Sequence, residues 1–226
     1  MLSPTVRSLV FRACDGAPFA FVAGQYVDLY VPGASGLVYK RPYSIASAPT
    51  HEVPGRFEIA VTRVEGGPTS EALHLIPVGA RVEADPPRGG FRLVPAAPEE
   101  TRLLVAAGTG LAPLRAMLEV DLAKVEGPRV ALLFGCRTEE HVLWREDLEA
   151  WGRARGRFSF EVTLSRLPAD WPGRVGYVQR HAAAMAHDLG AVQAYVCGLS
   201  KMVDEVGREL AGVGVAEEKV HRETYD

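Results

Sequence analysis

No run of apolar residues in this chain approaches the ~18 residues that a membrane-spanning helix needs. The first residues, MLSPTVRSLVFRACDGAP, also lack the apolar core and the small-residue cleavage site of a secretory leader. An excess of positive charge is missing as well, because the net charge is −3 and the basic residues are scattered, which argues against a nucleic-acid binder. We therefore expect a cytoplasmic protein that binds neither membranes nor nucleic acid.

Cysteine is scarce, and Cys14, Cys136 and Cys197 lie far apart in the sequence. No C-x-x-C pair is present. Structural zinc sites and iron–sulfur clusters are usually held by several closely spaced cysteines. We therefore expect neither a metal site nor an iron–sulfur cluster in this chain.

Asparagine is absent altogether, and arginine is far more frequent than lysine. The loss of asparagine is consistent with selection against deamidation at high temperature. A GC-rich genome explains the abundance of arginine, alanine, glycine and proline equally well, so both explanations stay open.

The first hundred residues have the pattern of antiparallel strands. Short alternating runs are separated by clusters of glycine, proline and serine, as in barrels and sandwiches. These runs are 19–33, 39–47, 55–64 and 80–94. One helix is expected at 69–76, with Thr69 or Ser70 as its N-cap.

Beyond residue 97 the pattern changes to alternating strands and helices. Continuous apolar runs such as 102–107 and 129–136 are typical of strands buried on both faces, and 111–126 carries leucines at helical spacing. The alternation predicts an α/β doubly wound parallel sheet of five strands. We therefore divide the chain into an antiparallel β-barrel domain, 1–97, and a nucleotide-binding-type α/β domain, 98–226.

The segment GTGLAPL (108–114) joins the first strand of the α/β half to its first helix. Gly108 and Gly110 allow a tight turn, and the free N–H groups at Thr109 and the helix start would face a diphosphate. Pro113 suits a first helical turn, where its missing N–H costs nothing. An ordinary glycine-rich turn would look similar, so the prediction of a phosphate site depends on the position of the turn between a strand and a helix.

Basic residues stand where the next two strands of the α/β half end. Arg137 occupies the place where an NAD site usually has an acidic residue, and Ser165 and Arg166 follow the third strand. A hydroxyl beside a guanidinium suits the 2′-phosphate of NADPH. Exposed arginines at loop starts are also common, so NADPH is favoured and NADH stays open.

The stretch RPYSIASAP (41–49) sets a cation, a ring and a hydroxyl almost side by side. Arg41 could pair with a phosphate, and Tyr43 could stack on a flat ring. Ser44 could form a hydrogen bond with a ring nitrogen. On a strand Arg41 and Tyr43 share one face and Ser44 points to the other, so one ligand meets all three only along the end or edge of the strand. A surface strand with one cation–aromatic contact remains the alternative.

In this order the motifs resemble the ferredoxin–NADP reductase superfamily of flavoenzymes over nearly the whole chain. The matching residues are Arg41, Tyr43 and Ser44 in R-x-Y-[S/T], Gly67 and Ser70 in GPTS, the GTGLAP turn, Cys197, Gly198 and Met202 in VCGLSKMV, and Glu223 and Tyr225 in RETYD. GQYVDLYVP (24–32) and PPRGGF (86–91) resemble flanking elements of that family. A frayed tail would be the alternative for RETYD.

The resemblance implies an FAD-dependent NAD(P)H oxidoreductase, with FMN the less favoured flavin, that transfers a hydride from nicotinamide C4 to flavin N5. It implies catalytic roles for Ser44, which would touch N5, and for Cys197 and Glu223 beside the nicotinamide. The motifs and the resemblance together place flavin contacts at Arg41, Pro42, Tyr43, Ser44, Val61, Gly67, Ser70 and Tyr225. They place nicotinamide-nucleotide contacts at Gly108, Thr109, Gly110, Pro113, Arg137, Ser165, Arg166, Cys197, Gly198 and Met202.

The electron acceptor is not fixed by the sequence. A ferredoxin or a flavodoxin is the partner that the resemblance implies. The alternatives are an electron-transfer subunit or reductase component of a larger complex, and a nucleotide-binding regulatory module without turnover.

Overall fold

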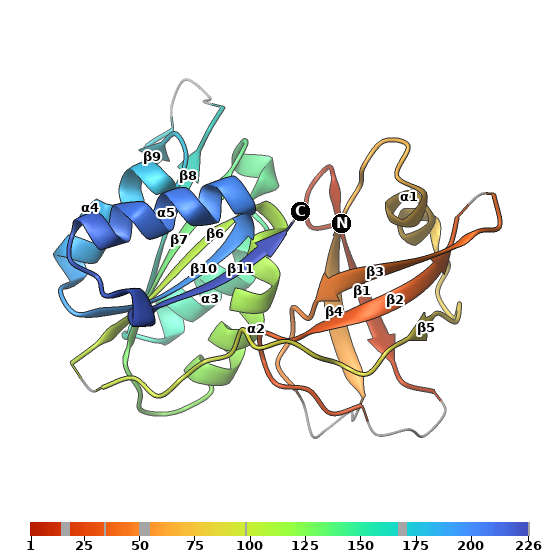
Figure 1. The fold of residues 1–226 in the computed structure, drawn as a ribbon, viewed down its shortest axis with the longest axis horizontal. Coiled ribbons are helices and arrows are strands. Elements are labelled where there is room, and N and C mark those ends of the chain that lie inside the picture. Colours follow the sequence, from red (N-terminus) through yellow and green to blue (C-terminus); the bar gives the residue numbers. More distant parts are fainter. Residues whose placement is uncertain (15–18, 34, 50–54, 98, 167–170, 226) are drawn as a thin grey trace.

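The computed structural model describes residues 1–14, 19–33, 35–49, 55–97, 99–166 and 171–225. The chain forms two parts that lie side by side (Figure 1). The first contains antiparallel strands, and the second contains a parallel sheet with helices, in the order expected from the sequence. In these ranges no helix is both long enough and apolar enough to cross a membrane.

Two small antiparallel sheets make up the first part. β1 pairs with β4, and β2 lies between β3 and β5. The strands are β1 (Val6–Arg12), β2 (Tyr26–Pro32), β3 (Val38–Ser44), β4 (Arg56–Thr62) and β5 (Glu83–Ala84). An isolated bridge between Ile45 and Ile59 connects the sheets over a common apolar core, so the predicted barrel is built as two sheets that meet at this bridge.

Strand β3 is an edge strand, because β2 is its sheet neighbour on one side and the sheet ends on the other. Ser44 pairs with Tyr26 of β2, and Pro42 pairs with Asp28. Paired residues point to the same face of a sheet. Tyr43 therefore points to the opposite face, where it packs against the apolar core.

Strand β1 is an addition to the predicted set of strands. Val6 and Leu9 are buried, whereas Val10 is half-exposed. This spacing departs from the strict alternation that marks a half-buried strand. The strand is recognisable only from its register with β4, in which Val6 lies opposite Thr62.

Helix α1 (Pro68–Leu75) begins earlier than predicted. Gly67 is its N-cap and Pro68 stands at the start of the helix, where a missing N–H leaves no hydrogen bond unmade. Thr69 and Ser70 are therefore inside the first turn, and the predicted N-cap at either residue was wrong.

The second part is a parallel sheet of six strands in the order β11-β10-β6-β7-β8-β9. The strands are β6 (Thr101–Ala107), β7 (Arg129–Cys136), β8 (Phe158–Leu164), β9 (Arg174–Val175), β10 (Val192–Leu199) and β11 (Val220–Tyr225). The predicted count of five is corrected to six by β9. This strand has two residues, too few to leave an apolar run in the sequence.

Helices cover both faces of this sheet, as in a doubly wound fold. α2 (Leu111–Leu122) and α3 (Arg145–Ala154) pack on one face, and α4 (Gln179–Leu189) and α5 (Ser200–Gly212) pack on the other. Short 3₁₀ turns complete the fold: η1 (Gly108–Gly110), η2 (Glu139–His141) and η3 (Glu217–Lys219).

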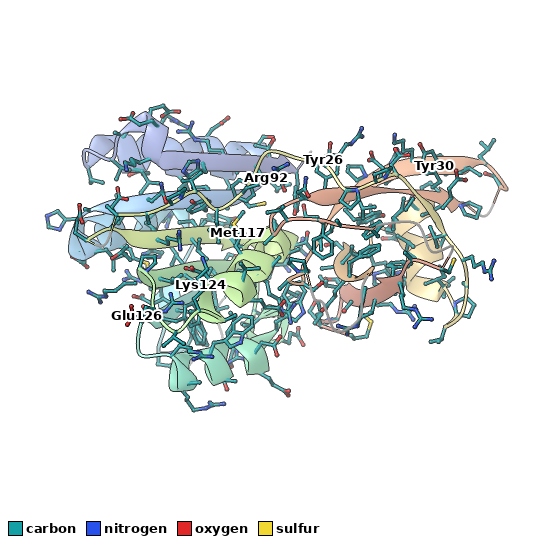
Figure 2. The ribbon with its side chains drawn as sticks, turned by 90° about the horizontal axis from the view of Figure 1, so that it is seen from below. Tyr26, Tyr30, Arg92, Met117, Lys124 and Glu126 are labelled. Atoms are coloured by element: carbon teal, nitrogen blue, oxygen red, sulfur yellow. The ribbon has the colours of Figure 1, made fainter. Side chains whose placement is uncertain are left out.

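The two parts are packed against each other through an apolar cluster. Ala46 and Ala60 from the first part belong to the same cluster as Met117 and Phe91, and Figure 2 shows Met117 on the side of α2 nearest the first part. A Cβ atom on Gly24 would lie 1.9 Å from the backbone oxygen of Phe91, so only glycine fits there. The domain boundary at residue 97 stays a prediction.

Candidate functional site

A cleft of about 670 Å³ lies where the two parts meet. Its walls come from β2, β3, β4 and α1 of the first part and from η1, α2 and β11 of the second. Clefts of several hundred Å³ between domains are the usual size and place for a cofactor or small-molecule site.

The cleft runs along the edge strand β3 and reaches both of its faces. Arg41 and Tyr43 line it from one side of the strand, and Pro42 and Ser44 line it from the other. The structure thus brings Arg41, Tyr43 and Ser44 to one cleft, in the arrangement that a ligand along the strand edge requires.

Arg41 presents an unneutralised positive charge to this cleft. The side chain is exposed, and one guanidinium nitrogen donates to the backbone oxygen of Lys40 at 2.9 Å. The guanidinium lies 5.9 Å from the ring centroid of Tyr39. No carboxylate pairs with Arg41 in the described part of the chain, so the charge is available for an anion.

The first turn of α1 contributes Thr69 to the wall of the cleft that Arg41 also lines. Thr69 is buried, and its hydroxyl oxygen has no hydrogen-bond partner among the residues described. Buried hydroxyls are rarely left unpaired, and the free N–H groups of a helix start favour an anion. Thr69 and Arg41 therefore fit a phosphate group, and the sequence analysis considered Thr69 only as a cap.

Ser70 and Gly67 both line the cleft, and their predicted flavin contacts stay predictions; Ser70 also bonds to the turn before α1. Its hydroxyl accepts from the N–H of Val64 at 3.1 Å and lies 3.1 Å from the backbone oxygen of Gly67. These bonds hold the 64–67 turn against α1. A Cβ atom on Gly67 would lie 2.7 Å from this hydroxyl, which explains the glycine of the GPTS motif by packing.

A buried carboxylate on β2 also lines the cleft. Asp28 is 3% exposed; Arg88 pairs with it, and Lys40 lies 3.5 Å from it. The guanidinium of Arg88 lies 5.4 Å from the ring centroid of Tyr26. All but Lys40 line the cleft, and the sequence analysis quoted the surrounding GQYVDLYVP and PPRGGF segments without selecting a residue from them.

At the end of the cleft, β11 brings a carboxylate to β3. Ser44 donates a hydrogen bond to Oε1 of Glu223 at 3.0 Å. Burial raises the pKa of Glu223, although the bond from Ser44 lowers it in part. Tyr225 also lines the cleft, and its hydroxyl is buried without a hydrogen-bond partner in the described ranges.

Cys197 and Val61 lie behind the walls of the cleft. Cys197 is fully buried, and burial together with Glu223 raises the pKa of its thiol. Val61 is 1% exposed and belongs to the core of the first part. In this conformation neither side chain lines the cleft, so their predicted contacts with ligand remain predictions.

The two glycines of the GTG turn have different surroundings. Gly108 is exposed, has a φ of 54°, and leaves open space where a Cβ atom would stand. A Cβ atom on Gly110 would lie 2.3 Å from the backbone oxygen of Cys197. Thr109 between them lines the cleft, and Pro113 is buried in the first turn of α2. Gly108 thus leaves room for a ligand, whereas Gly110 allows α2 to pack on β10.

The basic residues predicted to select the nucleotide are adjacent and exposed. The N–H of Arg166 donates to the backbone oxygen of Arg137 at 2.8 Å, and that of Ser165 donates to Cys136 at 3.0 Å. Neither guanidinium has a carboxylate partner in the part of the chain that the structure describes.

Gly198 and Met202 are packing residues in this structure. A Cβ atom on Gly198 would lie 2.8 Å from the terminal methyl group of Met202. Met202 belongs to the core between the sheet and α5. The Met202 side chain is buried, and the predicted contacts of Gly198 and Met202 with the nicotinamide nucleotide stay predictions.

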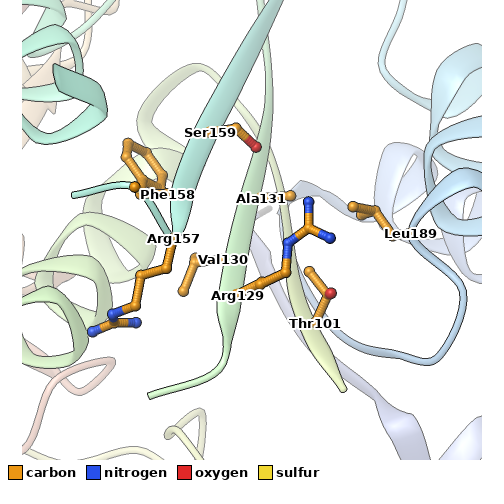
Figure 3. A pocket seen from close by; sticks show the side chains of 9 residues that line it. Thr101, Arg129, Val130, Ala131, Arg157, Phe158, Ser159 and Leu189 are labelled. Carbon is orange, nitrogen blue, oxygen red and sulfur yellow. The ribbon is translucent and has the colours of Figure 1, made fainter. Parts of the chain in front are cut away.

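A second, smaller pocket of about 50 Å³ lies at the opposite edge of the parallel sheet. Thr101, Arg129 and Arg157 line it at the amino ends of three strands (Figure 3). Its volume suits only a few water molecules, and ligands of doubly wound sheets bind at the carboxyl ends of the strands. The small pocket is therefore not part of the site.

Two family models match the chain. The oxidoreductase FAD-binding domain matches residues 1–93, and the oxidoreductase NAD-binding domain matches residues 104–208. The matched ranges correspond to the two parts of the fold.

Similar proteins include ferredoxin–NADP reductase B of Sorangium cellulosum, which is 46% identical in an alignment that covers 100% of this chain and 93% of that protein. The flavohemoprotein of Bordetella pertussis is 32% identical, and the alignment covers 99% of this chain and 58% of that protein. Among solved structures, the Amycolatopsis cytochrome P450 reductase GcoB has a TM-score of 0.86 and 28% identity over 99% of this chain and 66% of its own.

Proposed function

The chain belongs to the ferredoxin reductase-like superfamily of FAD- and NAD(P)-binding oxidoreductases, and from this membership we propose a location for each ligand. FAD lies in the cleft beside β3, and the nicotinamide nucleotide lies against the carboxyl edge of the parallel sheet. The observation that carries this proposal is the convergence of Arg41, Thr69 and Ser44 on one cleft along an edge strand.

The residues of the cleft fit FAD in charge and shape. Arg41 and the first turn of α1, with the unpaired hydroxyl of Thr69, suit the diphosphate. Tyr43 and Tyr225 line the cleft with aromatic rings that suit the flat flavin ring, and Ser44 offers a hydroxyl for a ring nitrogen. A flavin held by these residues would supply the redox chemistry, namely acceptance of a hydride from reduced nicotinamide and onward transfer of electrons.

The chain's own residues bind the flavin and the nucleotide, orient them, and exclude water from the cleft. Ser44 holds its hydroxyl at the reacting end of the cleft, and Oε1 of Glu223 fixes the direction of that hydroxyl. Because burial raises the pKa of Glu223, this carboxyl retains a proton at higher pH than an exposed glutamate does. The ring of Tyr225 covers the same end of the cleft and shields it from solvent.

For the nucleotide we propose that the GTG turn receives the diphosphate and that Arg137, Ser165 and Arg166 receive a 2′-phosphate. The open left-handed turn at Gly108 and the start of α2 support the first assignment. The adjacent exposed guanidinium groups of Arg137 and Arg166 support the second. NADPH is thus the preferred donor.

We propose that the acceptor is a one-electron carrier such as a ferredoxin or a flavodoxin. The support is the 46% identity to a protein named ferredoxin–NADP reductase over nearly the full length of both chains. A second candidate role is that of a reductase component in a larger complex. It is favoured by 32% identity to the phenol 2-monooxygenase reductase component DmpP of Pseudomonas, of which the alignment covers 56%.

We propose that the protein works in the cytoplasm. Cys14, Cys136 and Cys197 are all free thiols, and Cys14 is exposed. Free thiols are the normal state of cysteine in a reducing compartment.

An anaerobic titration of the purified, yellow protein with NADPH and then NADH tests this function. We expect the flavin absorbance to bleach with either nucleotide and with NADPH at lower concentration. Acid release and chromatography should identify the flavin as FAD. A protein that binds no flavin after reconstitution, or a bound flavin that neither nucleotide reduces, would overturn the proposal. Addition of ferredoxin and of flavodoxin to the reduced protein then distinguishes the acceptors.

A further inference from the structure

Arg115 on α2 is a buried arginine that contacts both parts of the molecule. Its Nη1 donates to the backbone oxygen of Ala46 at 2.7 Å and lies 3.4 Å from Oε2 of Glu58 in the first part. In the second part, Asp147 accepts from Nε at 3.2 Å and from Nη2 at 2.7 Å. Glu119, one helical turn along α2, lies 2.9 Å from Nη2. One guanidinium therefore joins β4, the segment after β3, α2 and α3.

Two tryptophan rings enclose this guanidinium. Its carbon lies 5.0 Å from the ring centroid of Trp144 and 5.8 Å from that of Trp151. The indole N–H of Trp144 donates to Oε1 of Glu58 at 3.0 Å, which adds another bond between the parts. Trp144 has a φ of 49°, a left-handed conformation that a bulky residue keeps only when its surroundings fix it. The contacts between the two parts therefore fix the conformation of Trp144 at this junction.

The same contacts lie close to both proposed ligand sites. Ala46 follows Ser44 by two residues, and Glu119 accepts a hydrogen bond from the N–H of Ala48 at 2.5 Å. At its other end, α2 begins directly after the GTG turn. A rotation of α2 relative to the segment 44–48 would therefore move the nucleotide relative to Ser44.

We propose that Arg115 is a positioning residue that sets the separation of nicotinamide and flavin by clamping α2 to the segment that follows Ser44. This inference rests on the proposed function for its kinetic consequence, although the clamp itself rests on the contacts alone. Hydride transfer requires reacting atoms at near-contact distance, and a misplacement of about 1 Å can cost about 100-fold in rate.

The charge balance at the junction explains why arginine is needed. Three carboxylates, those of Glu58, Glu119 and Asp147, surround the single guanidinium. Without it, like charges on the two parts would repel each other across the junction. Lysine would keep the positive charge but has no planar fork that reaches several acceptors at once, so Arg115→Lys loosens the clamp without reversing the charge.

The kinetic test is stopped-flow reduction of the flavin under anaerobic conditions. For Arg115→Lys we expect the limiting rate at saturating nucleotide to fall about tenfold or more, with the flavin content and the nucleotide dissociation constant within about twofold. Arg102→Lys is the matched control, because Arg102 is equally buried and pairs with Asp121 at 2.6 Å. Arg102 donates to the backbone oxygen of Val94 at 3.0 Å, and in the described ranges it bonds to none of the strands β1–β5. Arg102→Lys should lower thermal stability and leave the limiting rate within about twofold.

A second readout does not depend on turnover. Small-angle X-ray scattering can be measured on the flavin-loaded and the flavin-free protein. We expect the radius of gyration of Arg115→Lys to exceed that of the wild type, and that of Arg102→Lys to equal it. A wild-type limiting rate with unchanged scattering in Arg115→Lys would overturn the proposal. If neither nucleotide reduces the wild-type protein, the proposed function fails, whereas the scattering result still decides whether Arg115 is a clamp.

Trp144→Phe keeps an aromatic ring beside Arg115 but removes the N–H donated to Glu58 together with part of the indole, so it serves if Arg115→Lys does not fold. We expect a smaller loss of limiting rate, about threefold to tenfold, at normal flavin content. A limiting rate equal to that of the wild type in this variant would refute the clamp in that case.

Discussion

Ser44 donates a 3.0 Å hydrogen bond to Glu223, and this bond joins residues that are 179 positions apart in the sequence. It connects β3, an edge strand of the first part, to β11, the last strand of the second part. Ser44→Ala should therefore retain flavin, because Arg41 and α1 are unchanged, but should slow flavin reduction about tenfold, or ~1.4 kcal/mol in the barrier. Ser3→Ala is the control, since Ser3 is equally buried, does not line the cleft, and its hydroxyl accepts from the N–H of Val6 at 3.1 Å. A rate as fast as that of the wild type in Ser44→Ala would remove Ser44 from the catalytic residues.

Arg41→Ala should weaken retention of the flavin. A hydrogen bond to a charged group contributes about 1.5–3 kcal/mol, which corresponds to about one to two decades in the dissociation constant. Fluorescence titration of the flavin-free protein measures this change. Arg56→Ala on β4 removes an exposed arginine outside the cleft and should leave affinity unchanged. Equal affinities of the two variants would contradict the diphosphate assignment.

The two glycines of the GTG turn should respond differently to alanine. Gly110→Ala places a methyl group 2.3 Å from the backbone oxygen of Cys197, and such overpacking costs about 1–3 kcal/mol of unfolding free energy or more. Gly108→Ala meets open space, so only its left-handed backbone is penalised, by about 1 kcal/mol. Urea unfolding measures the free energy of unfolding of both variants. In Gly108→Ala we expect the loss of nucleotide-binding free energy to exceed the loss of unfolding free energy. The reverse order of stabilities would show that the turn is packed differently.

The partly buried carboxyl of Glu223 predicts a pH dependence of stability. Burial raises its folded pKa above the unfolded value of about 4.3. Its stabilisation is therefore full below the unfolded pKa and is lost as pH rises through the folded pKa. Glu223→Gln keeps an acceptor for Ser44 and cannot ionise, so it should match the wild type in acid and be more stable at neutral pH. Urea unfolding between about pH 4 and pH 8 spans this window.

A control of opposite sign is available on the same part of the chain. Arg222 lowers the pKa of Glu217, so Glu217 stabilises the fold above its unfolded pKa and loses this effect as pH falls through the folded pKa. Glu217→Gln should thus be slightly less stable than the wild type at neutral pH and equal to it in acid. If Glu223→Gln behaves in the same direction as Glu217→Gln, the environment assigned to Glu223 is wrong.

Nucleotide choice should depend on Arg166. The wild type should have a higher kcat/KM with NADPH than with NADH, and Arg166→Ala should lower the NADPH value about tenfold, or ~1.4 kcal/mol, with little effect on NADH. Arg153→Ala is the control, since Arg153 is 73% exposed on α3 and lies 3.7 Å from Glu149. An equal loss with both nucleotides would make Arg166 a structural residue and leave the flavin assignment untouched.

The order of the two parts and most of their strands follow from sequence patterns because those patterns are local. Turn residues mark the antiparallel strands, and apolar runs mark the strands buried on both faces. β9 could not be predicted, because two residues carry no period. The start of α1 was misplaced because Gly67 acts as the N-cap without a side-chain hydrogen bond, and Pro68 determines the first turn.

Much of the site depends on contacts between distant segments, which no local pattern contains. The R-x-Y-S stretch identified three residues of the cleft, but Thr69 becomes notable only because its hydroxyl is buried without a partner. The burial of Cys197 depends on the packing of the sheet, and the contacts of Arg115 depend on how the two parts meet. Sequence indicates which chemistry is present, whereas these distances depend on the assembled fold.

Because the edge of β3 is open, the supply of flavin affects the tendency of the chain to aggregate. Without flavin, the unpaired backbone groups of this strand and the side chain of Val38, which is 61% exposed, form a template for pairing with a second extended chain. The charges of Lys40 and Arg41 on the same strand oppose that pairing. In a cell short of flavin, newly made chains would therefore be lost to association as well as to inactivity, and light scattering of the flavin-free protein with and without added FAD measures that loss.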